Sequence, residues 1–162
     1  MNHEVKMEED QIFHRNCGEI LRMGLDVETT IDYFISNYFC APQSYKTFLL
    51  RDLILVEQIG FGRKIEIFKK ICKMENIDEE RINKIVEAVK SVNNIRNRVA
   101  HDEAFVSDQK EGIKLQKRKS VQYKKDELKI TDELVKEVDE KRTFSNQEIV
   151  RLHVELSDPS RE

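Results

Sequence analysis

The repeat of apolar residues between positions 17 and 38 constrains the fold more than any other feature of the sequence. Small or apolar residues recur there at steps of three and four, which is the spacing of one face of an α-helix. The members of this stripe are Cys17, Ile20, Gly24, Val27, Ile31, Phe34 and Tyr38. We therefore expect a helix over about residues 11–39. Gly24 costs this helix about 1 kcal/mol of intrinsic propensity, and the compensation that we expect is the close approach of a neighbouring helix.

A second helix is expected over residues 44–58, because Pro42 ends the first helix and Ser44 can cap the next one. The same spacing predicts that its inward residues are Phe48, Leu49, Leu53 and Val56. The following "IGFG" predicts a tight turn, since Gly60 and Gly62 tolerate backbone angles that other residues avoid.

Two more helices follow this turn. The third has its inward face at Phe61, Ile65, Phe68 and Cys72. The fourth runs from about Asp78, a candidate N-cap, to Ala100. Its stripe consists of Ile82, Ile85, Val89, Val92, then Arg96, then Val99. Both segments therefore predict amphipathic helices that bury one face.

The rest of the chain gives a weaker pattern. Residues 112–130 alternate weakly, which indicates a short basic β-hairpin or an exposed loop. Residues 131–156 are expected to be helical, either as two helices separated by a capping box of Ser145 and Glu148 or as one long helix. With only 5 Gly, 2 Pro and no Trp in 162 residues, we predict an all-α antiparallel bundle of four to five helices.

Length and composition narrow the classes of protein. We expect one domain over residues 1–162, with a core over 11–105, a variable basic segment over 106–130 and C-terminal helices over 131–156. No run of eighteen apolar residues and no apolar signal core are present, so we expect a cytoplasmic protein without a membrane partner. The three cysteines and four histidines show no metal-binding spacing, so neither a metal nor another cofactor is expected.

The charge distribution leaves room for a nucleic acid. The net charge is −3, but the stretch 109–129 holds eight basic residues against three acidic ones. A solvated charged surface is the ordinary meaning of such a run, and a surface that faces RNA is the alternative. The candidate RNA-binding residues are Lys117, Arg118 and Lys119, together with Arg63 at the start of the third helix. Lys64 beside it is a weaker candidate, with a place on the helix surface as the default.

The last turns of the fourth helix carry the candidate active site. Asn97 and His101 are four residues apart and share a face, and Arg96 adjoins them in line with the apolar stripe. An arginine grips phosphate with a planar fork, and an imidazole exchanges protons near neutral pH. Together they suit RNA cleavage in which the ribose 2′-hydroxyl attacks the neighbouring phosphate.

A structural interpretation of the same residues stays open. His101 could simply place a cation at the negative end of its helix. Arg96 could pair with an acidic residue on a neighbouring helix, such as Asp52 or Glu57. Arg98 is expected on the solvent-facing side, and Asp102 is expected to end the helix, with orientation of His101 as its alternative role.

"IRNRVAH" resembles the R-x4-H signature of the HEPN superfamily, with Arg96, Asn97 and His101 at the signature positions. "EILRMGLDVETTIDYFISNYF" resembles the long first helix of that family. "FGRKIEIFKKI" and "INKIVEAVKSVNNIRNRVAH" resemble the helix pair that delivers the motif, so the resemblance covers about residues 12–105. Mannitol-repressor-like bundles have a similar order of helices.

The resemblance implies an all-α bundle that dimerises and joins two motifs into one metal-independent endoribonuclease site. Such proteins act in toxin–antitoxin, CRISPR-associated or antiphage systems, so a separate antitoxin or regulatory protein is an expected partner besides RNA. Other members are non-catalytic RNA-binding or regulatory modules. We therefore expect an HEPN-type ribonuclease acting as a homodimer, with a non-catalytic binding module or a purely structural dimerisation subunit as alternatives.

Overall fold

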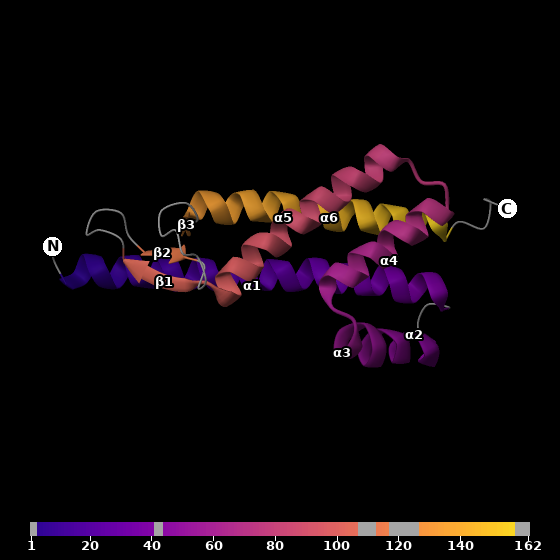
Figure 1. The fold of residues 1–162 in the computed structure, drawn as a ribbon, viewed down its shortest axis with the longest axis horizontal. Coiled ribbons are helices and arrows are strands. Elements are labelled where there is room, and N and C mark those ends of the chain that lie inside the picture. The colour runs from indigo at the N-terminus through magenta and orange to yellow at the C-terminus, as the bar shows by residue number, and fades with distance from the viewer. Residues whose placement is uncertain (1–2, 41–43, 107–112, 117–126, 158–162) are drawn as a thin grey trace. The chain divides into compact units, whose positions relative to one another are not determined.

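The computed structural model of the chain is mostly helical (Figure 1) and describes residues 3–40, 44–106, 113–116 and 127–157. The helices are α1 (His3–Phe39), α2 (Tyr45–Leu49), α3 (Val56–Gln58), α4 (Phe61–Met74), α5 (Glu79–His101) and α6 (Asp132–Leu156). A π-helical stretch, η1 (Leu50–Leu55), joins α2 to α3, so that residues 45–58 form one helical run. The described residues therefore contain five helical runs, and the predicted fold class is confirmed.

The chain divides into two compact units, which we describe separately. The first, called here the sheet unit, comprises residues 1–24 and 91–141, and the second, the helical unit, comprises residues 25–90 and 142–162. Each of the helices α1, α5 and α6 contributes one segment to each unit. The prediction of a single domain is not tested by this division and stays a prediction.

The sheet unit holds a three-stranded antiparallel sheet in the order β1 (Glu103–Val106), β2 (Ile113–Gln116) and β3 (Glu127–Lys129). The pair β2–β3 confirms the predicted hairpin, whereas β1 was not predicted. In this sheet Leu115 lies opposite Ala104 on one side and Leu128 on the other. The core of the unit consists of Phe13, Ile20, Leu115 and Ile130, with Cys17, Ile95, Val99, Leu128, Leu134 and Val135 packed against it. The sheet therefore closes the apolar surface at the C-terminal end of α5.

The helical unit buries its part of the stripes predicted for α1, α4 and α5, except that Tyr38 and Phe61 are only half-buried. Its fully buried side chains include Val27, Ile31, Phe34, Ile65, Phe68, Cys72, Ile82, Ile85 and Val89. The rings of Phe34 on α1 and Phe68 on α4 meet edge to face with their centroids 5.0 Å apart. Repeated apolar residues at steps of three and four were thus sufficient to identify the buried faces of three helices.

The predicted inward face of residues 45–58 is wrong. Phe48, Leu53 and Val56 are 55%, 50% and 60% exposed, and Leu49 is only half-buried. The buried residues are Thr47 and Leu55 instead. For Leu53 and Val56 the cause is the π-helical stretch, in which the Val56 N–H donates to the Arg51 carbonyl, five residues back. Phe48 and Leu49 lie before that stretch, so their predicted face was wrong without it. A turn wider than 3.6 residues rotates everything beyond it away from the face that α-helical spacing predicts.

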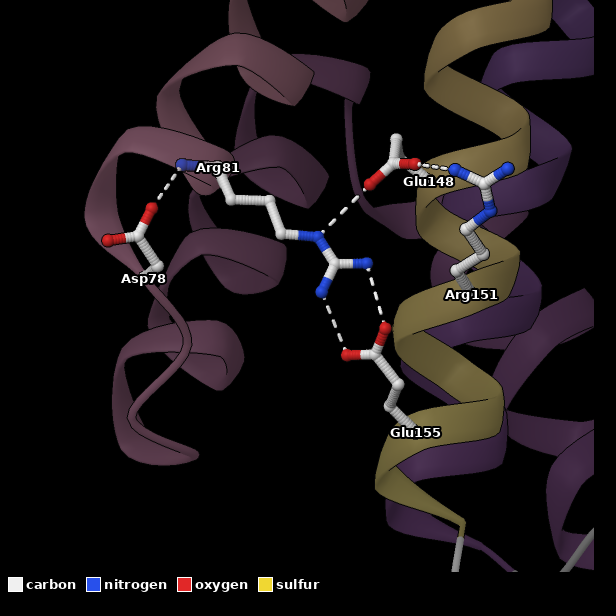
Figure 2. Close-up of polar contacts among 5 residues, drawn as sticks. All are labelled: Asp78, Arg81, Glu148, Arg151 and Glu155. Carbon is white, nitrogen blue, oxygen red and sulfur yellow. Dashed lines mark hydrogen bonds and ion pairs between the residues drawn. The ribbon is translucent and has the colours of Figure 1, made fainter.

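The helix boundaries follow local capping chemistry. The Thr47 N–H donates to the Ser44 hydroxyl at 3.2 Å, which confirms Ser44 as the N-cap of α2. Asp78 accepts from the Arg81 N–H at 2.8 Å (Figure 2), which confirms the predicted cap of α5. Glu79 and Glu80 occupy the first turn, where the helix dipole favours negative charge. These caps begin two helices where the sequence predicts that they begin.

The tight turn predicted at Gly60 and Gly62 needs correction. Gly60 is the N-cap residue of α4 with φ −65° and ψ 150°, and Gly62 lies within α4, so neither glycine serves a left-handed turn. Among the described residues the non-glycine with positive φ is Asn76, at 55°, in the break before α5. Asparagine tolerates this region better than most residues because its short side chain bonds locally.

Of the two alternatives for the C-terminal segment, the single long helix is confirmed and the split is wrong, since α6 continues without a break from Asp132 to Leu156. Ser145 is buried, and its hydroxyl donates to the Arg142 carbonyl within the helix instead of capping a new one. In the part of the chain that the structure describes, no helix is long and apolar enough to cross a membrane.

Candidate functional site

The candidate site lies at the C-terminal end of α5, within the sheet unit. One side of this helical end, at Ile95 and Val99, packs against the core of the unit. Arg96 and Asn97 occupy adjacent positions and are half-buried, while His101 is the last residue of the helix and is exposed. The end of α5 thus presents three polar side chains beside an anchored apolar face.

Gly24 on α1 forms the seat of the Arg96 side chain. A Cβ atom added at Gly24 would lie 2.5 Å from Cγ and 2.9 Å from Cβ of Arg96. Only a residue without a side chain allows this approach, so the prediction that a neighbouring helix comes close at Gly24 is confirmed. The aliphatic stem of Arg96 packs where a side chain would otherwise stand, and this packing holds the arginine in place.

The guanidinium of Arg96 has an amide neighbour and no acidic one among the described residues. Its Nη1 donates to Oδ1 of Asn97 at 3.0 Å. The acidic partners expected under the structural interpretation do not reach it, since Asp52 pairs with Arg51 at 2.6 Å and Glu57 forms no ion pair within the described ranges. A guanidinium carries five N–H donors, and the bond to Asn97 uses one of them within the described residues, which leaves the others for an anion there.

His101 forms no side-chain hydrogen bond and no ion pair within residues 3–40, 44–106, 113–116 and 127–157. The helix around it is closed by the Asp102 N–H, which donates to the Arg98 carbonyl at 2.8 Å. An exposed imidazole at a helix end can reach a ligand, and it also suits the structural interpretation of a cation at the negative end of the dipole. The geometry of His101 is compatible with both.

The prediction for Arg98 is wrong. It was expected to face solvent, but its side chain is 21% exposed, and Nε donates to Asp102 at 2.8 Å. Its Nη2 also reaches the Leu115 carbonyl of β2 at 3.5 Å. The spacing of four residues between arginine and aspartate on one helix face could have indicated this pair. Arg98 therefore anchors the end of α5 to the sheet, and Asp102 is engaged by Arg98 instead of orienting His101.

Of the predicted RNA-binding residues, Arg63 alone lies within the described part of the chain. Arg63 is exposed on α4 in the helical unit. Lys117, Arg118 and Lys119 lie outside the described residues, and so does most of the basic stretch. In its described part, Lys114 on β2 pairs with Glu127 on β3 at 2.9 Å. At least one of the basic residues counted in that stretch thus serves the hairpin itself.

A buried charged cluster in the helical unit was missed by sequence reasoning. Lys64, considered above as a surface residue that could reach RNA, is 1% exposed. Its Nζ donates to Glu28 at 2.7 Å and to Asp32 at 2.8 Å. Burial raises the pKa of Asp32, against the opposing effect of the hydrogen bond from Lys64. The signal available in the sequence was the pair Glu28 and Asp32, four residues apart on one face of α1.

Comparison with known proteins adds no family to this description. Among the described residues, no group of three or more His, Cys, Asp or Glu side chains is arranged to hold a metal ion. The chain matches no protein-family model, no curated protein and no solved structure. The likeness of "IRNRVAH" to the R-x4-H signature therefore stays a prediction from the sequence.

Proposed function

We propose that the end of α5 is the active site of a metal-independent endoribonuclease of the HEPN type. The observation that supports this most is the seat of Arg96: its stem packs on Gly24 while its guanidinium has only the Asn97 amide as a partner among the described residues. A structural arginine in a half-buried position normally has an acidic partner. An arginine held in place without one suits a ligand that carries its own negative charge.

The roles of the three residues follow from their chemistry. Arg96 binds the phosphate and stabilises the charge that develops on its oxygens. The 2′-hydroxyl attacks phosphorus, the bond to the 5′-oxygen breaks, and the products carry a 2′,3′-cyclic phosphate and a 5′-hydroxyl. His101 transfers a proton in this reaction. Asn97 orients the Arg96 guanidinium through their hydrogen bond.

The proposal includes a homodimer that brings two copies of the motif to one RNA. A role as a toxin or antiphage effector, with a separate antitoxin or regulatory protein, belongs to the same proposal. One observation favours a second candidate, a non-catalytic RNA-binding or regulatory module. His101 has no orienting hydrogen bond within the described residues, whereas a catalytic histidine is commonly oriented by a third group.

The decisive experiment measures cleavage of short labelled RNAs in EDTA by the wild type, His101→Ala and Arg96→Ala. His14→Ala serves as the matched control, because His14 is an exposed histidine on α1. We expect each site variant to lose roughly 10²- to 10³-fold in rate, with unchanged thermal unfolding, and the wild-type products to end in 2′,3′-cyclic phosphate. Cleavage by His101→Ala at the wild-type rate would reject the proposal. RNA binding without cleavage, unchanged in His101→Ala, would establish the second candidate.

A further inference from the structure

The helical run 45–58 exposes more apolar surface than a helix of a stable monomer normally does. Apolar residues make up more than half of the run, yet its fully buried residues are Thr47 and Leu55 alone. The large exposed side chains are Tyr45, Phe48, Leu53, Ile54 and Val56, between 46% and 76% exposed. A group of exposed apolar side chains on one helical run marks an interaction surface.

The π-helical stretch explains how the outward face arises. Thr47 and Leu55 lie inward, and so does Arg51, whose guanidinium carbon stands 4.6 Å from the centre of the Tyr33 ring on α1. These inward positions recur every fourth residue, at 47, 51 and 55. Positions 45, 49, 53 and 57 fall halfway between them and thus point to the opposite side. π-helical segments are rare and occur often at functional positions.

Complementary charges stand at the two ends of the run, with Glu57 on the outward face and Lys46 beside that face. Lys46 near its start and Glu57 near its end are both exposed, and neither forms an ion pair within the described residues. If two copies of the run lie antiparallel about a twofold axis, each Lys46 meets the partner's Glu57. The same register sets the outward Leu49 and Leu53 against the flanking Ile54 and Leu50 of the partner, respectively. A parallel arrangement would instead bring Lys46 against its own copy, which is repulsive.

We propose that residues 45–58 are a self-association surface, covered by the same helix of a second copy in antiparallel orientation. Such an interface is isologous, because the same patch serves both subunits. The proposal does not rest on RNA cleavage, since its residues belong to the helical unit and the candidate active site belongs to the sheet unit. It adds an assembly surface to the pairing of motifs proposed above.

The test follows the molar mass of the full chain by light scattering and sedimentation over a dilution series. Leu53→Glu is expected to halve the mass of the wild-type oligomer at every concentration at which that oligomer forms, since it buries a charge in the apolar centre. Met74→Glu is the matched control, because Met74 is 71% exposed at the end of α4, outside the surface. A wild type that is monomeric throughout, or an oligomer that Leu53→Glu leaves intact, would overturn the proposal.

Charge reversal tests the orientation. Lys46→Glu and Glu57→Lys should each weaken association roughly tenfold, because each creates two like-charged contacts. The double variant Lys46→Glu/Glu57→Lys restores both pairs and should associate within about threefold of the wild type. Lys70→Glu, at an exposed lysine of α4, controls for the change in net charge. A double variant as weak as the two single variants would show that these charges do not meet, and the antiparallel register would be wrong.

Discussion

Helix α5 carries Arg81 near its start and Arg96 near its end, and these two arginines have opposite surroundings. Arg81, in the helical unit, donates from Nε to Glu148 at 3.0 Å and from Nη1 and Nη2 to Glu155 at 2.8 and 3.0 Å (Figure 2). Both glutamates belong to α6. Arg96, in the sheet unit, has the Asn97 amide as its side-chain partner within the described residues. Arg81 is neutralised by carboxylates of α6, whereas no carboxylate among the described residues pairs with Arg96.

The difference separates a structural arginine from one that can bind a ligand. The fork of Arg81 is occupied on two sides by acidic groups, which is the arrangement that cross-links two helices. The aliphatic stem of Arg96 packs against Gly24 and holds the side chain in place. This contact does not involve the N–H donors of the guanidinium. The sequence singles out Arg96 by its place in line with the apolar stripe, but it does not show which of the two arginines has carboxylate partners.

The largest expected effect is on catalysis. If the proposed function is correct, Arg96→Ala lowers the rate of RNA cleavage by roughly 10³-fold while its free energy of unfolding changes by less than about 1 kcal/mol. Arg81→Ala should do the reverse and retain the cleavage rate at temperatures where it is folded. Single-turnover kinetics and denaturant unfolding on the same preparations measure both quantities. Equal losses of activity in the two variants would remove the distinction between the two arginines.

The next effect is on stability. Arg81→Ala should lower the free energy of unfolding by about 2 kcal/mol, because it leaves two half-buried glutamates without their main donor. Arg151, which also contacts Glu148 but is 65% exposed, is the matched control (Figure 2). Arg151→Ala should cost less than about 0.5 kcal/mol. Urea unfolding measures the loss of unfolding free energy in both variants. A larger loss for Arg151→Ala than for Arg81→Ala would contradict the role given to Arg81.

Gly24→Ala tests whether the close contact at Gly24 is what positions the Arg96 side chain. The new methyl group would overlap the stem of Arg96, at a cost of about 1–3 kcal/mol that a helix-propensity gain of about 1 kcal/mol only partly offsets. Gly18→Ala on the same helix should be stabilising, since a Cβ there meets nothing within 4 Å. In the double variant Gly24→Ala/Arg96→Ala the loss of stability caused by the overlap should disappear. Thermal unfolding of the wild type, Gly24→Ala, Arg96→Ala and the double variant measures this coupling. An additive double variant would show that Gly24 does not seat Arg96.

The smallest effect concerns acid stability. Burial disfavours the charged form of Glu148, but the hydrogen bonds from Arg81 and Arg151 outweigh it, so the pKa of Glu148 is lowered. A lowered pKa in the folded state stabilises the protein above the unfolded-state pKa of about 4.3, and this stabilisation is lost as the pH falls through the folded value. The stability difference between wild type and Arg81→Ala should therefore narrow between about pH 5 and pH 3. Urea unfolding at several pH values measures it, and a difference independent of pH would exclude this contribution of Glu148.

The helices themselves show where sequence patterns suffice and where they fail. For α4 and α5 the apolar spacing predicts the buried residues, and Asp78 predicts the start of α5, because both depend on contacts within a few residues of the chain. For residues 45–58 the same spacing predicts the wrong face. The pattern assumes 3.6 residues per turn, and a π-helical hydrogen bond from Val56 to Arg51 breaks that assumption without a mark in the composition.

For the candidate site, too, some features were predictable from the sequence and others were not. The polar residues at the end of α5, and a close helix contact at Gly24, were predictable because helical periodicity decides which residues share a face. Spacing could not decide that Arg96 is the residue in that contact, that Arg98 is held by Asp102 and Leu115, or that Lys64 is buried between two carboxylates. These facts depend on which residues distant in the chain come within hydrogen-bonding range. Periodicity assigns a side chain to a face, and only tertiary packing assigns it a partner.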